Sequence, residues 1–143
     1  MSSLPEVGAE LPPWDVPAVS GEKMKTMAAL LHDSNPIHFD IPSVQALGLG
    51  DRPVNQGPSN MAYVMNMLAA WAGGTDRIRS LRVRFLGNVL ADQHLRASGV
   101  VTAVRHEEGG PVAECDVLLS IVGGDPVLSG TATVLLNDPG AGA

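Results

Sequence analysis

The second half of the chain, after Asp76, alternates between hydrophobic and polar residues. Apolar side chains at 81, 83 and 85 are separated by arginines, and a second alternating stretch runs from 113 to 121. A period of two is typical of strands with one buried face. The stretches 96–105 and 127–136 are apolar and rich in Val and Thr, and turn-forming residues separate these segments. The pattern predicts about four antiparallel strands.

The first half begins with a predicted arm, a short strand and a helix. Residues 1–13 are rich in Pro, Gly and Ser, which indicates an extended, partly mobile arm. Residues 14–19 suit a short strand. Ser20 is a suitable N-cap for a helix that runs to Leu30. Pro36 disfavours helical geometry at the residue before it, so this helix has to end upstream.

A longer helix is predicted at 58–72. Pro58 suits its first turn, where no backbone N–H is needed, and the helix is apolar apart from Asn60 and Asn66. A helix without a polar face is expected to be buried rather than laid on a surface. The pair Gly73-Gly74 is expected to end it.

With a short helix predicted at 43–47, this order of elements implies an α+β fold in which an antiparallel sheet wraps around one buried helix. The chain has 143 residues, so we expect a single domain over residues 1–143. A single sheet of this kind leaves an edge strand and one face open. Dimerisation is a common way to cover such surfaces.

Composition excludes several classes of protein. Hydrophobic residues make up 45% of the chain and charged residues 17%, which excludes intrinsic disorder. The net charge of -6 argues against a nucleic-acid binder. A single cysteine, Cys115, excludes a disulfide framework and a cysteine-based zinc site. We expect no signal peptide and no membrane span, and therefore a setting in the reducing cytoplasm.

The densest polar cluster is the loop that reads DSNPIHFD, from Asp33 to Asp40. It places a carboxylate, Asp33, and an imidazole, His38, on a segment that Pro36 prevents from continuing as a regular helix. The two side chains are therefore able to converge, and an Asp and a His that share a water molecule act as general base and general acid. Asn35 is expected to hold the loop through a bond from its side chain to the backbone.

A second signal lies at the start of the long helix, in the sequence Asn55-Gln56-Gly57-Pro58. A helix N-terminus offers free backbone N–H groups and a positive dipole end, and glycine lets a ligand approach closely. The Gly57 N–H is thus a candidate to polarise a carbonyl and stabilise an oxyanion. Hydration of an α,β-unsaturated thioester, or the reverse dehydration, needs these groups and requires no metal, flavin or nicotinamide.

Structural interpretations of the same residues remain open. Asp33 also suits a turn cap, and His38 suits a buried, hydrogen-bonded histidine. A metal cluster of His32, Asp33, His38 and Asp40 is disfavoured because the spacing matches no common zinc pattern.

Two further features have simple interpretations. Cys115 is expected to be an inert core thiol. The arginines at 77, 79, 82 and 84 form either a solvated strand face or a site that attracts a phosphate group or an acidic carrier protein.

The loop from Asp33 to Asp40 resembles the D-x-N-P-[IL]-H-x-D signature of the MaoC-like (R)-specific enoyl-CoA hydratases and dehydratases. The resemblance extends to residues 8–13, 71–73, 78–90 and 129–134, and so covers nearly the whole chain. It implies a hot-dog fold, in which the sheet wraps a central helix at 58–72. It also implies a dimer with active-site tunnels at or near the subunit interface.

By position, the resemblance implies that Asp33 and His38 are the catalytic pair and that the Gly57 N–H binds the thioester carbonyl. Asn35 matches the asparagine of the motif. Many members carry His-Gly where this chain has Gln56-Gly57, so Gln56 is a candidate substrate contact that cannot titrate as histidine does. The expected substrate is a thioester of coenzyme A or of acyl carrier protein. The alternatives are a hot-dog thioesterase and the catalytic half of a heterodimer of two hot-dog chains.

Overall fold

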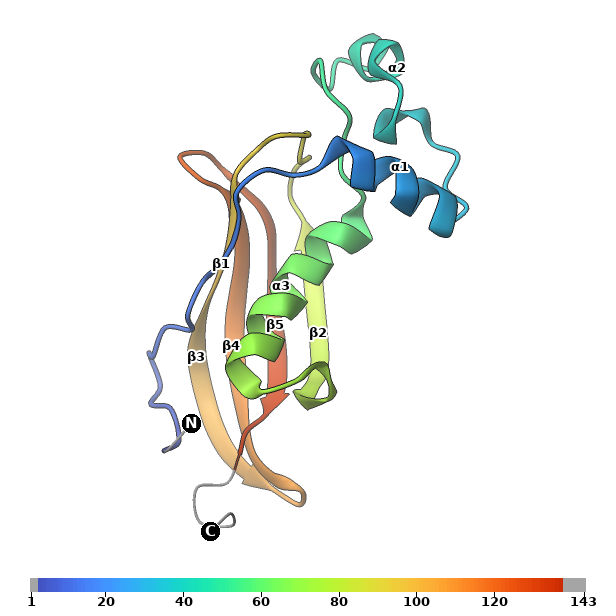
Figure 1. Cartoon of the computed structure of the whole chain (residues 1–143). Coiled ribbons are helices and arrows are strands. Elements are labelled where there is room, and N and C mark those ends of the chain that lie inside the picture. The colour runs from blue at the N-terminus through green and yellow to red at the C-terminus, as the bar shows by residue number, and fades with distance from the viewer. Residues whose placement is uncertain (1–2, 138–143) are drawn as a thin grey trace.

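The computed structural model describes residues 3–137, which form one five-stranded antiparallel sheet with a long helix along its inner face (Figure 1). The sheet order is β1-β3-β4-β5-β2, with bounds β1 (Trp14–Val16), β2 (Ile78–Phe85), β3 (Leu95–Glu107), β4 (Gly110–Ile121) and β5 (Pro126–Leu135). The helices are α1 (Gly21–Leu30), α2 (Ile41–Ala46) and α3 (Gly57–Ala72), with 3-10 turns η1 (Pro36–His38) and η2 (Thr75–Arg77). The predicted α+β architecture is confirmed.

The ends of the helices follow from local chemistry. The Ser20 side chain accepts a hydrogen bond from the Lys23 N–H and starts α1 as predicted. Gly73 ends α3 in the left-handed conformation, with a φ of 100°, which glycine adopts without a steric penalty. The short helix α2 begins before the predicted 43–47, because Asp40 caps it through the Ser43 N–H.

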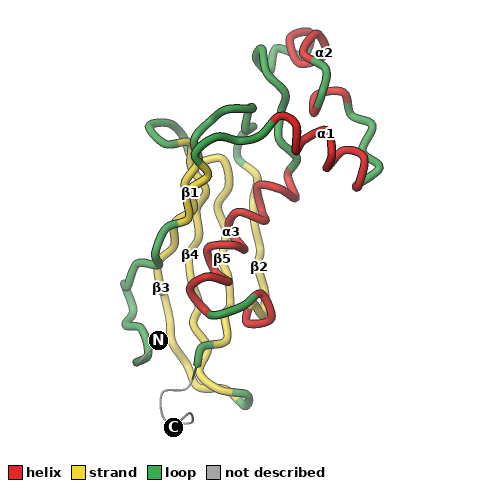
Figure 2. The backbone as a smooth tube through the Cα atoms, viewed as in Figure 1, coloured by secondary structure: helices red, strands yellow, loops and turns green. Residues whose placement is uncertain are grey.

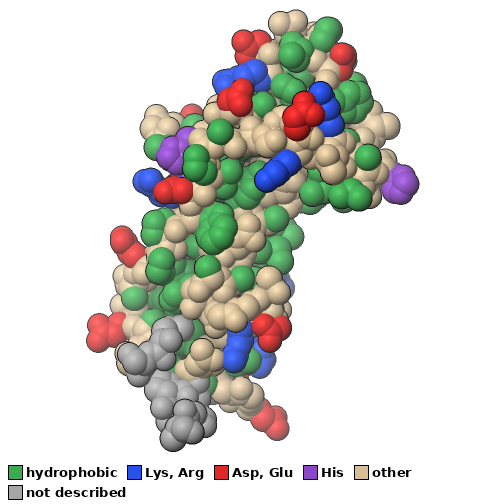
Figure 3. All heavy atoms as spheres, viewed as in Figure 1, with side chains coloured by type: hydrophobic (Ala, Val, Ile, Leu, Met, Phe, Trp, Pro, Cys, Tyr) green, Lys and Arg blue, Asp and Glu red, His purple; other side chains and the backbone are tan. Residues whose placement is uncertain are grey.

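One side of α3 packs against the sheet and forms the core. Val64, Met67, Leu68 and Ala72 are buried against the inward positions of the central strands, which include Cys115, Leu119, Leu128, Ala132 and Val134. The opposite side of α3, at positions 62, 66 and 70, is exposed. The prediction that the helix is buried all round is therefore wrong for the chain by itself. Figure 3 shows the side of the molecule on which α3 is exposed, with hydrophobic side chains over its middle and charged ones towards its ends.

Alternation along the strands is confirmed in β4 and only in part in β2. Leu81 and Val83 are half-buried against the core, whereas Phe85 is 52% exposed. Phe85 differs from its pattern because β2 is an edge strand and this residue is its last. Gly130 is the partner of Val83 in β2, and a Cβ on it would lie 2.1 Å from the Arg82 carbonyl oxygen. The close approach of β5 to β2 therefore requires glycine.

The N-terminal arm and the small helices lie at the margins of the sheet. Gly8 and Leu11 donate backbone hydrogen bonds to β3, and Ala9 accepts one, so this part of the arm extends along the edge strand. Helices α1 and α2 gather beyond the N-terminal end of α3 and form a lobe of their own (Figure 2). We call residues 21–50 the helical lobe. Within residues 3–137, no helix is long and apolar enough to cross a membrane.

Candidate active site

The DSNPIHFD loop leaves α1 and turns sharply at its start. His32 adopts a positive φ of 51°, and the Asp33 N–H donates to the Ala28 carbonyl at 2.9 Å. Asp33 Oδ1 accepts a hydrogen bond from the Asn35 N–H at 3.0 Å, and Asn35 Oδ1 accepts one from the Ile37 N–H at 3.2 Å. The side chains of Asp33 and Asn35 therefore shape the loop, as predicted for Asn35.

The loop brings Asp33 and His38 together. Asp33 Oδ2 lies 3.0 Å from His38 Nε2, and His38 Nδ1 lies 2.6 Å from the Val54 carbonyl oxygen. A carbonyl oxygen only accepts, so Nδ1 carries a proton, and the contact between Nε2 and Oδ2 requires one further proton between them. The His38 side chain is 9% exposed and the Asp33 side chain 35%, so the pair opens to solvent on the Asp33 side.

A pocket adjoins this pair. Its volume is about 470 Å³, and its lining comprises Lys25, Ala28, Ala29, Asp33, Ser34 and Phe39. A larger pocket of about 760 Å³ lies between the arm and the outer face of the sheet, where Ser98, Asp116 and Thr131 contribute to its lining. Asp33 lines the smaller pocket and contacts His38, so we place the candidate site there.

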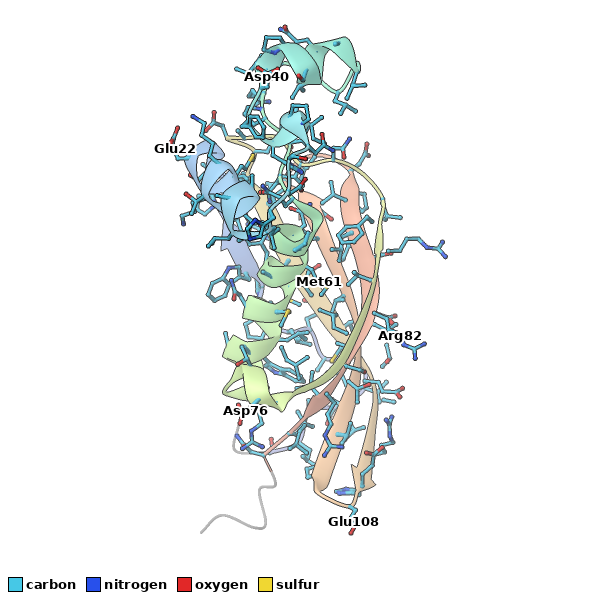
Figure 4. All side chains as sticks on the ribbon, turned by 90° about the vertical axis from the view of Figure 1, so that its right-hand side faces the viewer. Glu22, Asp40, Met61, Asp76, Arg82 and Glu108 are labelled. Atoms are coloured by element: carbon cyan, nitrogen blue, oxygen red, sulfur yellow. The ribbon has the colours of Figure 1, made fainter. Side chains whose placement is uncertain are left out.

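Asp40, the last residue of the DSNPIHFD loop, lies apart from the Asp33–His38 pair. Asp40 sits at the start of α2 (Figure 4), where its carboxylate accepts from the Ser43 N–H at 3.2 Å. Within residues 3–137, no three His, Cys, Asp or Glu side chains form a group able to hold a metal ion. The observed partners of Asp40 are those of a helix cap.

Gly57 begins α3 three residues after Val54, the residue whose carbonyl holds His38. The first N–H groups of a helix have no partner inside it, and the dipole there is positive. The Phe85 ring covers Gly57, because its Cζ lies 3.2 Å from the point that a Gly57 Cβ would occupy. The contacts of His38 with Val54 and of Phe85 with Gly57 thus bring the Asp33–His38 pair, the start of α3 and the end of β2 into one region.

Gln56 is buried, and its side chain points into the protein. Its Nε2 donates to the Met24 carbonyl oxygen of α1 at 2.8 Å, while its Oε1 has no hydrogen-bond partner within the described residues. This bond ties the helical lobe to the start of α3. A role of Gln56 or Asn35 in substrate binding stays a prediction, since each side chain already makes a structural hydrogen bond.

A buried polar network flanks Gly57 and adds Asn60 and Tyr63, which were not predicted near the site, to Asn55. Asn55 Nδ2 donates to Asn60 Oδ1 at 2.7 Å and lies 3.3 Å from the Tyr63 hydroxyl. Asn55 is 7% exposed and Asn60 is 3% exposed. The signal was present in the sequence, because an asparagine at the centre of an apolar helix face needs a buried hydrogen-bond partner.

Cys115 belongs to the core and not to the site. Its side chain is buried, and burial, with a smaller contribution from the charge of Asp116, raises the pKa of the thiol to about 11. A thiol with a raised pKa is a poor nucleophile, because the thiolate is the reactive form. The prediction of an inert core thiol agrees with this burial.

Comparison with known proteins gives one family and one fold. Residues 11–119 match the family model described as MaoC like domain. No curated protein sequence matches the chain significantly.

Three solved structures are similar to the chain over nearly its whole length. The (R)-hydratase from A. caviae involved in PHA biosynthesis has a TM-score of 0.80 at 23% identity, covering 92% of this chain and 97% of that one. R-Hydratase PhaJ1 from Pseudomonas aeruginosa has a TM-score of 0.78 at 17% identity, with coverages of 93% and 83%. The ChsH1-ChsH2 complex from Mycobacterium tuberculosis has a TM-score of 0.77 at 22% identity, with coverages of 94% and 100%. At these identities the likeness shows the shared fold.

Proposed function

Because the chain belongs to the MaoC-like dehydratase family and has its hot-dog fold, we propose that it is a hydro-lyase acting on an acyl thioester. It would add water to an enoyl thioester to give the (R)-3-hydroxyacyl thioester, or remove water from that (R)-3-hydroxyacyl thioester. The observation that carries the proposal is the contact of 3.0 Å between Asp33 Oδ2 and His38 Nε2 beside an open pocket. A carboxylate and an imidazole at this distance supply a general base and a general acid in one place.

The proton between Asp33 and His38 gives the pair its two roles. In the hydration direction, the Asp33 carboxylate takes a proton from water as the water oxygen bonds to the β-carbon. The His38 Nε2–H then gives its proton to the α-carbon. Transfer of the proton from Asp33 Oδ2 back to His38 Nε2, across 3.0 Å, restores the starting state. The Val54 carbonyl keeps Nδ1 protonated throughout, so only Nε2 exchanges a proton.

Negative charge develops on the thioester oxygen during either reaction. We assign its stabilisation to the Gly57 N–H, at the positive end of α3. Gly57 has no side chain, and the Phe85 ring lies beside it. This chemistry needs no metal ion and no redox group. The substrate is bound as its coenzyme A or acyl-carrier-protein thioester.

The pairing of chains is part of the proposal. Strand β2 is an open sheet edge, and its last residue, Phe85, contacts Gly57. A second hot-dog chain, either identical or different, would pair along β2 and close the site from that side. The free thiol of Cys115 agrees with function in the reducing cytoplasm.

The test is the ultraviolet absorbance of enoyl-CoA thioesters, from crotonyl-CoA to longer and bulkier acyl groups, in the presence of the purified protein. We expect wild type to bleach the enoyl chromophore, and Asp33→Asn and His38→Ala each to lower kcat by about 10²–10⁴-fold. Asp51→Asn and His106→Ala are matched controls, because both residues are exposed. Near wild-type turnover in Asp33→Asn and in His38→Ala would overturn the assignment.

The same assay separates the alternative thioesterase activity. A thioesterase releases a free thiol, which a disulfide reagent detects, and leaves the enoyl chromophore unchanged. The pairing of Asp33 with His38 favours the hydro-lyase, because attack on the carbonyl needs only one activated water and no proton for carbon.

A further inference from the structure

Residues 54–57 connect the two halves of the proposed site, and we call them the connecting segment. The Val54 N–H donates to the Ile37 carbonyl at 2.8 Å, and the Val54 carbonyl holds His38 Nδ1 at 2.6 Å. Three residues later, Gly57 begins α3. A rotation of the connecting segment would therefore move the imidazole and the Gly57 N–H relative to each other.

The start of α3 lacks the usual side-chain cap. Gln56 is the N-cap residue, but within the described residues its side chain makes no capping hydrogen bond, and its amide nitrogen donates to Met24 of α1. An uncapped start leaves the positive end of a helix open to a ligand. It does not fix the angle at which the chain enters the helix, so other side chains have to do so.

A group of three polar side chains connects the entering chain to α3. Asn55 precedes the N-cap and Asn60 is the fourth residue of the helix. An apolar contact between these two positions, the hydrophobic staple, commonly fixes the entry angle of a helix. Here Asn55 Nδ2 donates to Asn60 Oδ1 at 2.7 Å and lies 3.3 Å from the Tyr63 hydroxyl. We call Asn55, Asn60 and Tyr63 the polar staple.

Stability alone does not explain why this staple is polar. Asn55 and Asn60 are both buried, and burial of an amide costs free energy that one hydrogen bond offsets only in part. Two apolar side chains at the same positions would gain from burial instead. Apolar contacts are non-directional, however, whereas a hydrogen bond has a preferred distance and angle. The polar staple therefore fixes the orientation of the connecting segment more narrowly than an apolar one.

We propose that the polar staple is the positioning device of the site. Asn55, held by Asn60 and Tyr63, fixes the connecting segment so that the His38 imidazole and the Gly57 N–H act on the same substrate. The inference rests on the proposed function and adds positioning residues to it. The three residues act through the backbone of the connecting segment and not on the reacting atoms themselves.

An apolar staple separates positioning from stability. The double variant Asn55→Leu/Asn60→Leu keeps the branch at Cγ and removes both amides, and its melting temperature checks that it folds. We expect a melting temperature within a few degrees of wild type, a kcat lower by at least about tenfold and a KM changed by less than about threefold. Asn66→Leu is the matched control, because Asn66 is exposed on the same helix, and it should keep the kcat of wild type.

The Nδ1–H proton of His38 reports on the same geometry without substrate. In protein with isotope-labelled histidine, the hydrogen bond to the Val54 carbonyl should protect this proton from exchange with water and give a resolved NMR signal. We expect exchange at least tenfold faster in the double variant and no change in Asn66→Leu. A protein without turnover would still give this signal, so failure of the proposed function is distinguishable from failure of the inference.

Asn60→Asp is the conservative variant, because it keeps an acceptor oxygen for Asn55 Nδ2. We expect it to retain most of kcat and the slow exchange of the His38 proton, whereas Asn60→Leu loses both. These two single variants provide the test if the double variant does not fold. Wild-type kcat and wild-type proton exchange in a folded double variant would overturn the inference, and so would equal losses in Asn60→Asp and Asn60→Leu.

Discussion

The two carboxylate oxygens of Asp33 have different partners. Oδ1 accepts the Asn35 N–H and holds the loop, while Oδ2 faces His38 Nε2. Asn35 supports the same geometry from the other side by accepting the Ile37 N–H and capping the turn that carries His38. At this scale, one short run of sequence contains both the residues proposed to react and those that position them.

Asn35→Ala tests the positioning role. The substitution removes the acceptor for the Ile37 N–H, so His38 loses its fixed place relative to Asp33. We expect kcat to fall by about tenfold, and the free energy of unfolding by about 1 kcal/mol, as for loss of other side-chain caps. Steady-state kinetics measures kcat, and urea unfolding measures the free energy of unfolding. Asn35→Asp keeps the acceptor oxygen and should retain most of kcat, and equal losses in both variants would contradict the positioning role.

Cys115 gives a pH dependence of stability with a definite sign. Burial raises the pKa of its thiol from 9.0 to about 11 in the folded chain. Below pH 9 both states hold the proton and the thiol makes no difference. Between pH 9 and about 11 the unfolded chain releases the proton first, so the free energy of unfolding falls as pH rises. We expect the urea midpoint of wild type to fall more steeply over this range than that of Cys115→Ala, and parallel curves would contradict the raised pKa.

At the scale of elements, the curvature of the sheet around α3 depends on how closely neighbouring strands and the helix approach one another. Gly99, Val117 and Gly130 pair in one row across β3, β4 and β5, and a Cβ on Gly99 would come within 3.3 Å of Met67 on α3. The missing side chains let the sheet curve and let α3 lie close to it. The long strands and the central helix therefore pack closely because these two positions carry no side chain.

Gly130→Ala tests this closure. The new Cβ would lie 2.1 Å from the Arg82 carbonyl oxygen, a backbone atom, so β2 and β5 would have to separate. We expect a loss of about 3 kcal/mol or more in the free energy of unfolding, in the range of substitutions that strain a packed core. Gly87→Ala is the control, since its Cβ would meet only Val127 Cγ1 at 3.8 Å. Equal melting temperatures for the two variants would show that the strands adjust without cost.

At the scale of the whole molecule, the candidate site lies where a part of the chain with few buried side chains meets the well-packed core. Asp33 and His38 belong to the helical lobe, which has few buried side chains, whereas Gly57 begins the helix that anchors the core. The Gln56 amide bound to the Met24 carbonyl is one of the connections between them. The relative placement of the catalytic pair and the Gly57 N–H therefore depends on how firmly the lobe is held.

Hydrogen exchange measures this difference. Amides of β4, in the middle of the sheet, should be the slowest to exchange, while those of α1 and α2 should exchange at least tenfold faster through local opening. Mass spectrometry of peptides from 21–50 and from 110–121 provides the comparison. Equal protection in the two sets would show that the lobe and the sheet open as one unit.

The sequence by itself determined the class of fold and located the candidate catalytic loop. Period-two alternation located the long strands, capping residues located α1 and α3, and the loop from Asp33 to Asp40 carried enough chemistry to indicate a hydratase. These features are local: they depend on neighbours within a few positions, so they can be read along the chain.

Only the tertiary structure decided which side chains are free to act. The Gln56 amide nitrogen donates to the Met24 carbonyl of α1, and Phe85, predicted inside, lies exposed over Gly57. The partner of His38 Nδ1 is a carbonyl from residue 54, and the open edge formed by β2 follows from the strand order. Each depends on contacts between segments far apart in sequence, which no local pattern specifies.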